Sequence, residues 1–117
     1  MSKKHRFKNG GFTIAEIVIV VAIIGVLSAV AIVNFIRARQ MAYTNICVTN
    51  MRRVEDSIQN WAIGENKSQA DVPTTADLVP HYIKSWPACP QRNTPYVPCA
   101  VSGTIECPVD PETHRLE

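Results

Sequence analysis

Proline is absent from the first 72 residues of the chain, and charged residues are absent from Ile17 to Ile36. All eight prolines fall between Pro73 and Pro111. Because proline interrupts regular structure, a long helix is permitted in the first half and regular elements should be sparse in the second. The chain also lacks a nucleophile elbow, a phosphate-cradling glycine loop and a pair of acids tied to a histidine. We therefore expect no enzyme and no cofactor.

The charge distribution gives no support for nucleic-acid binding. The formal net charge of +2 comes from the first eleven residues, where four Lys and Arg stand with no acid. In the remainder, eight Lys and Arg face ten Asp and Glu. A chain of this balance has no basic excess with which to neutralise phosphates, so no nucleic-acid partner is expected.

The uncharged segment has the length of one membrane crossing. Twenty residues at about 1.5 Å rise each span roughly 30 Å of hydrocarbon as a helix. The many Ile and Val residues would favour a strand in water, but in lipid a lone segment satisfies its backbone only as a helix. Four basic residues precede the segment and only Arg37 and Arg39 follow closely, which predicts a cytoplasmic N-terminus and an exported remainder. Membrane lipid is therefore an expected partner.

An apolar stripe follows the uncharged segment, with steps of four and three residues that are typical of a helix. Polar residues on its other faces, Asn50, Glu55 and Gln59 among them, are expected to be solvated. Gly64 is the expected stop, so the sequence predicts one helix of about fifty residues from Phe12 to Ile63. The stripe consists of Tyr43, Cys47, Met51, Val54, Ile58 and Trp61.

The residues after Gly64 predict little regular structure. Thr74 or Thr75 could cap a short helix through residues 77–79. A hairpin is predicted from Tyr96–Val101 and Thr104–Cys107, which are joined by a serine and a glycine.

A carboxylate lies at the edge of the apolar segment, in the stretch Gly11-Phe12-Thr13-Ile14-Ala15-Glu16. An acid within a membrane costs on the order of 2 to 3 kcal/mol at mid-membrane, so Glu16 is expected to have a partner. If the chain is cut between Gly11 and Phe12, the new α-amino group of Phe12 supplies a cation four residues away. In a filament of parallel, axially offset helices, that amine can meet the carboxylate of a neighbouring copy.

This order of features resembles the class III signal of type IV prepilins and type II secretion pseudopilins. The resemblance is firm over residues 3–36 and looser along the amphipathic helix. It implies that a membrane-bound prepilin peptidase cuts after Gly11 and methylates Phe12, and that Glu16 sets the register with the adjacent subunit. Many members have proline where this chain has Val33, so the helix loosening that this proline causes is not implied here.

The resemblance implies an α+β, pilin-like fold. Its expected parts are a leader at 1–11, a transmembrane and filament-core helix at 12–36, an amphipathic continuation at 37–64 and a small globular head at 65–117. The implied function is a pilin or pseudopilin that polymerises with copies of itself through an inner-membrane assembly platform. The chain would lie first in the bacterial inner membrane and then in a periplasmic or extracellular filament. The alternatives are a minor subunit that primes a filament, and a secreted disulfide-rich binding module cut near Ile32 by ordinary signal cleavage.

Four cysteines in a small chain suit an oxidising compartment. Four cysteines allow three pairings, of which we favour Cys47 with Cys89 and Cys99 with Cys107. Zinc is the alternative, because Cys89, Cys99, Cys107 and His114 are an adequate set of ligands. Their spacings lack the short paired ligands of known zinc modules, so no metal is expected.

Overall fold

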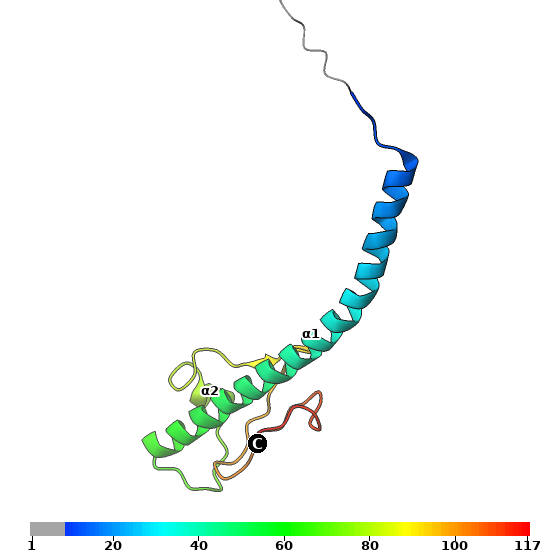
Figure 1. Ribbon diagram of the computed structural model, residues 1–117. Coiled ribbons are helices and arrows are strands. Elements are labelled where there is room, and N and C mark those ends of the chain that lie inside the picture. Colours follow the sequence, from blue (N-terminus) through cyan, green and yellow to red (C-terminus); the bar gives the residue numbers. More distant parts are fainter. Residues whose placement is uncertain (1–8) are drawn as a thin grey trace, which may run out of the picture. The chain divides into compact units, whose positions relative to one another are not determined.

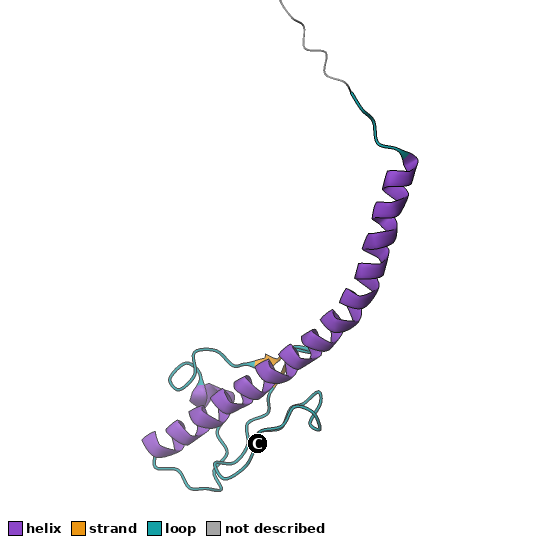
Figure 2. Ribbon diagram, viewed as in Figure 1, coloured by secondary structure: helices purple, strands orange, loops and turns teal. Residues whose placement is uncertain are grey.

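The computed structural model describes residues 9–117, so most of the expected leader lies outside the described residues. The fold is α+β, with one long helix followed by a small region that contains a short two-stranded sheet (Figures 1 and 2). The two strands pair in antiparallel fashion, Ala88 with Pro95 and Cys89 with Thr94. The elements are α1 (Ile14–Gly64), α2 (Thr75–Leu78), β1 (Ala88–Cys89) and β2 (Thr94–Pro95). The predicted fold class is confirmed.

Helix α1 is 51 residues long and contributes to two compact units, which divide after Arg37. In the first unit, every large apolar side chain from Ile17 to Ile36 is at least 50% exposed. These side chains surround the helix, because the segment contains no charged residue on any face. Within residues 9–117, α1 is the helix whose length and composition would allow it to cross a membrane.

The second unit begins at Ala38 and has an apolar core built on the second half of α1. Five of the six residues of the predicted stripe are buried, and Tyr43 is half-buried. The opposite side of the core comes mostly from loops, with Leu78 of α2 and Cys89 of β1, which fits the concentration of proline there. Its buried apolar residues are Cys47, Met51, Val54, Ile58, Trp61 and Ala62 of α1 with Leu78, Cys89, Tyr96, Val101, Ile105 and Cys107.

We expect Met51→Ala to lower the free energy of unfolding of this unit by about 2 to 5 kcal/mol. The Met51 side chain is fully buried, so its loss removes apolar contacts and leaves a cavity. Met41 is the matched control, because it lies on the same helix and is 63% exposed; its replacement by alanine should cost less than about 0.5 kcal/mol. Urea unfolding of the full chain in detergent, followed by tryptophan fluorescence, measures both, since both tryptophans lie in the second unit. Equal effects of the two substitutions would contradict the assigned core.

Polar side chains of α1 hold the loops in place, which corrects the expectation that they are only solvated. The amide of Gln59 donates to the carbonyl oxygen of Val101 at 2.7 Å, and the Glu55 carboxylate accepts from the N–H of Ile105 at 3.2 Å. The Asn50 amide donates to the carbonyl oxygen of Ala88, on β1, at 3.3 Å. Loops that form few strands leave backbone groups without ladder partners, and these side chains supply them.

Helix α1 ends at Gly64, as predicted, but by a different mechanism. The left-handed residue is Asn66, with φ of 51°, and the N–H of Lys67 donates to the carbonyl oxygen of Ala62 at 2.9 Å. This is the long closing bond of a Schellman motif. Gly64 has another role, because a Cβ atom there would lie 2.7 Å from the hydroxyl oxygen of Tyr82.

The hairpin predicted over residues 96–107 is wrong. Pro98 lies in this segment, and proline cannot donate to a strand ladder. The N–H of Val101 donates instead to the carbonyl oxygen of Asp71 at 3.1 Å, so the segment pairs with another loop. The short helix predicted after Thr74 is present as α2, where the Asp77 carboxylate accepts from the N–H and hydroxyl of Thr74 at 2.8 and 2.7 Å.

Candidate functional site

The junction between the residues that precede α1 and the first turn of this helix is closed by a reciprocal pair of hydrogen bonds. The N–H of Thr13 donates to the Glu16 carboxylate at 2.8 Å, and the N–H of Glu16 donates to the Thr13 hydroxyl at 3.3 Å. This is a capping box, which satisfies two backbone donors at the helix end. The negative charge of Glu16 also lies in the first turn of α1, where the helix dipole stabilises it.

The capping box gives Glu16 a partner that we did not predict. The signal was in the sequence, because Thr-x-x-Glu before an apolar run is a recognised helix start. An ionised carboxylate has about four acceptor positions, so the bond to Thr13 leaves others for a second donor. Gly11 and Phe12 precede the helix, and Phe12 is 87% exposed. The junction is therefore accessible within the described residues.

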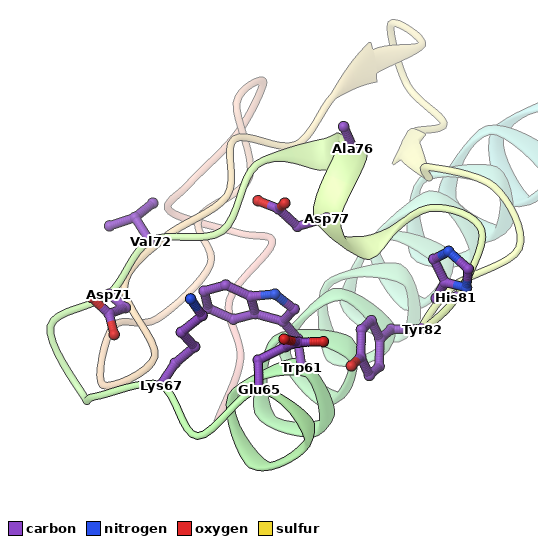
Figure 3. A pocket seen from close by; sticks show the side chains of 9 residues that line it. All are labelled: Trp61, Glu65, Lys67, Asp71, Val72, Ala76, Asp77, His81 and Tyr82. Carbon is purple, nitrogen blue, oxygen red and sulfur yellow. The ribbon is translucent and has the colours of Figure 1, made fainter.

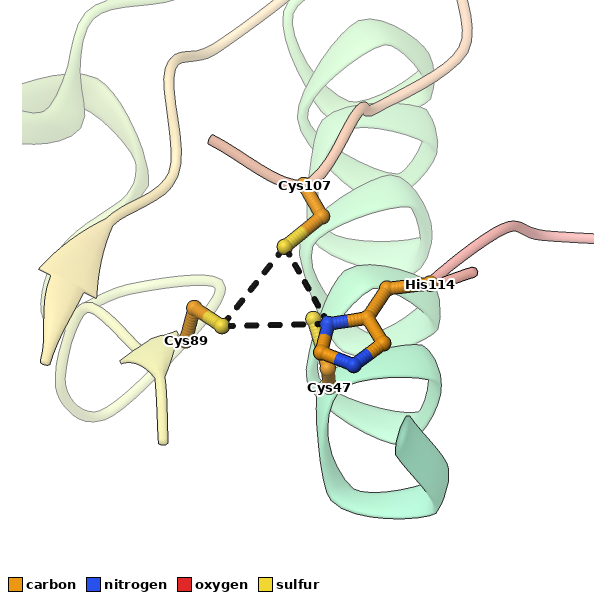
Figure 4. A group of neighbouring side chains, drawn as sticks. All are labelled: Cys47, Cys89, Cys107 and His114. Carbon is orange, nitrogen blue, oxygen red and sulfur yellow. Dashed lines mark hydrogen bonds between the residues drawn. The ribbon is translucent and has the colours of Figure 1, made fainter. Parts of the chain in front are cut away.

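A second cluster lies in the unit that begins at Ala38. The Sγ atoms of Cys47, Cys89 and Cys107 and a ring nitrogen of His114 all lie within 4.8 Å of one another (Figure 4). Cys99 is not part of this group. All four cysteines are free thiols, so neither predicted disulfide is formed in the structure.

Burial and hydrogen bonding act differently on the thiols of the cluster. Burial raises the pKa of Cys47 to about 12, and it also raises the pKa of Cys89. Burial likewise disfavours the thiolate of Cys107, but hydrogen bonds from the backbone of Asp110 and Val109 outweigh it and lower the pKa of this thiol to about 7. The cluster therefore combines two protonated thiols with one that is close to ionisation.

Comparison with known proteins identifies the N-terminal segment. Residues 6–32 match the family described as the prokaryotic N-terminal methylation motif. Over 45 residues the chain is 47% identical to the type IV major pilin protein PilA of Myxococcus xanthus (strain DK1622). The chain is type IV pilin-like. That alignment covers 38% of this chain and 20% of the relative, and no solved structure matches the chain.

The pilin-like segment and the predicted site residues coincide. Residues 6–32 include Gly11, Phe12 and Glu16, together with most of the apolar half of α1. The cysteine and histidine cluster lies outside this range, so the match to the methylation motif says nothing about it.

The pilin-like chain also has an open hollow of about 820 Å³ beyond the end of α1 (Figure 3). The Lys67 ammonium lies 5.5 Å from the centre of the Trp61 ring and packs on its face. Two carboxylates at the hollow already accept hydrogen bonds from the chain itself. Asp71 accepts from the N–H of Ser68 at 2.7 Å, and Asp77 caps α2. These acids stabilise turns around the hollow. Its lining residues are Trp61, Glu65, Lys67, Asp71, Val72, Ala76, Asp77, His81 and Tyr82.

Proposed function

We propose that the chain is a structural subunit, a pilin or pseudopilin, that is cut after Gly11 and polymerises through α1 with copies of itself. The observation that supports this most is the apolar surface of residues 17–36. The large apolar side chains of this uncharged segment point in every direction, and each of them is at least half exposed. Burial of apolar surface is favourable at roughly 25 cal/mol per Å², so this segment requires a cover on all sides.

Lipid and neighbouring copies of the same helix can shield this apolar surface from water, one after the other. Lipid suits a segment that has the length and composition of a membrane span. Neighbouring copies of the same apolar helix can replace lipid without exposing the surface to water. The proposed route is therefore from the inner membrane, with the N-terminus in the cytoplasm, into a periplasmic or extracellular filament, with a prepilin peptidase and an inner-membrane assembly platform as partners.

The proposed cut also supplies a second partner for Glu16. Cleavage after Gly11 creates an α-amino group on Phe12, next to the capping box. Within one helix the carboxylate is already held by Thr13. The remaining acceptor positions of Glu16 suit the methylated amine of an adjacent subunit, which would fix the axial offset between copies.

The mass and N-terminal sequence of the chain recovered from its own membranes test this function. We expect a methylated chain that starts at Phe12, together with a filament fraction that contains the same species. A chain that starts near Ile32 would instead indicate ordinary signal cleavage and a secreted module. An intact Met1 would indicate a permanent anchor. Either of these results would contradict the proposal.

A further inference from the structure

The cysteine and histidine cluster has the geometry of a tetrahedral metal site. The Sγ atoms of Cys89 and Cys107 are 3.5 Å apart, and the Nδ1 atom of His114 lies 3.4 Å from Cys107 Sγ and 4.0 Å from Cys89 Sγ. Around a zinc ion with Zn–S of about 2.3 Å and Zn–N of about 2.0 to 2.1 Å, ligand atoms are separated by about 3.6 to 3.8 Å. These three separations lie within about half an ångström of the expected values, and Cys47 Sγ completes a set whose four atoms all lie within 4.8 Å of one another.

The four ligand atoms come from four separate parts of the chain (Figure 4). Cys47 lies on α1, Cys89 on β1, Cys107 in the loop that follows Ile105, and His114 in the C-terminal turn. All four residues are at most 3% exposed. A site closed to solvent with four protein ligands has the form of a structural zinc centre. A catalytic zinc centre differs, because it keeps one coordination position open for water or substrate.

Neighbouring groups support the proposed ligands. The Tyr96 hydroxyl donates to Cys47 Sγ at 3.1 Å, and the N–H of Asp110 donates to Cys107 Sγ at 3.5 Å. The Asp110 carboxylate accepts from the hydroxyl and N–H of Thr113 at 2.6 and 3.2 Å, which fixes the turn that carries His114. Donors to ligand sulfur and a held histidine backbone are the outer contacts that orient metal ligands.

A disulfide explains this arrangement less well than a metal. The cluster contains three sulfur atoms, so a disulfide within it would leave one thiol unpaired. It would also leave His114 buried, with only weakly hydrogen-bonding sulfur around Nδ1. Three thiolates and one imidazole satisfy a single tetrahedral Zn²⁺ ion completely, and soft sulfur ligands in this geometry favour zinc over calcium or magnesium.

We propose that Cys47, Cys89, Cys107 and His114 bind one structural Zn²⁺ ion, which ties the C-terminal segment and β1 to helix α1. The sequence did not predict this set. From the sequence we considered a ligand set with Cys99 in place of Cys47, and we expected no metal because its spacings lack the short paired ligands of known zinc modules. The zinc site is independent of processing at Gly11, so it can fail while the proposed function stands.

Metal analysis of the full chain tests the site. The protein is purified in detergent from membranes with its thiols kept reduced, equilibrated with Zn²⁺, and freed of excess metal. We expect about one zinc per chain by mass spectrometry, as a four-ligand structural site requires. Replacement by Co²⁺ should give the visible bands of a tetrahedral site and the near-ultraviolet bands of thiolate ligation.

Matched variants separate the cluster from the remaining cysteine. Cys99→Ser should keep the full zinc content and the cobalt spectrum, whereas Cys107→Ser and His114→Ala should each lower zinc content at least about tenfold. His114→Cys should retain zinc, because four thiolates also form a structural site. If Cys107→Ser does not fold, the wild-type and Cys99→Ser cobalt spectra decide alone. A reduced wild-type chain that binds no zinc, or a chain from membranes with a disulfide within the cluster, would overturn the proposal.

Discussion

Replacing Gly11 with leucine should leave the chain uncut in its own membranes and abolish filaments. A peptidase that cuts after Gly11 must accept this residue next to the scissile bond, and a branched side chain there would obstruct it. A Cβ atom at Gly11 would meet nothing within 4 Å, so there is open space for a side chain at this position. The measurement is the intact mass of the membrane-bound chain, which should change from the species that starts at Phe12 to one that retains the leader.

Gly10 provides the matched control for this experiment. A Cβ atom at Gly10 also meets nothing within 4 Å, so the two substitutions are equivalent for the folded chain. They differ in distance from the expected cut, and Gly10→Leu should still be matured. Full maturation of the Gly11→Leu chain would show that the cut lies elsewhere.

Replacing Glu16 with glutamine should reduce the yield of filaments by about 10- to 150-fold while the chain is still cut. Hydrogen bonds to a charged group contribute about 1.5 to 3 kcal/mol, which corresponds to this range. Glutamine can replace glutamate in a capping box, so α1 should begin at the same residue. The substitution therefore removes the charge that faces the amine of a neighbouring subunit and keeps the helix cap. Electron microscopy of sheared cells, normalised to the amount of matured chain, measures the yield.

Thr13→Ala makes the opposite change at the same junction. It removes the hydroxyl that accepts from the N–H of Glu16 and keeps the carboxylate. Loss of a cap costs about 1 kcal/mol of helix stability, so we expect the filament yield to stay near that of wild type. Normal filaments from Glu16→Gln, with few from Thr13→Ala, would mean that Glu16 acts only as a cap.

The features that could be predicted from the sequence are those specified by nearby residues. The first half of the long helix follows from an uncharged segment of membrane-span length. The buried stripe of its second half follows from spacings of three and four residues, and Met51, Val54 and Ile58 lie on the core side as expected. The stop at Gly64 was placed correctly, although Asn66 supplies the left-handed conformation. Local periodicity fixes such elements, because neighbours along a helix share a face.

The features that could not be predicted depend on contacts between distant residues. Cys47 and His114 meet only because loops without regular structure return to α1, and no local pattern encodes that return. The same holds for the bond of Gln59 to the carbonyl of Val101, which joins residues 42 apart. Loops whose backbone groups are satisfied by side chains carry no periodic signal, so the spacing of cysteines alone did not indicate which of them assemble.

The sharing of one core between helix and loops decides where a water-soluble version of the chain can begin. Half of the buried apolar residues belong to α1, and the first of them is Cys47. A recombinant protein that starts after Gly64 would lack these side chains, and its loops would have nothing to fold against. One that starts at Ala38 retains the whole compact unit and omits the apolar half of the helix. Ala38 is therefore the starting point that we expect to give a folded product without detergent.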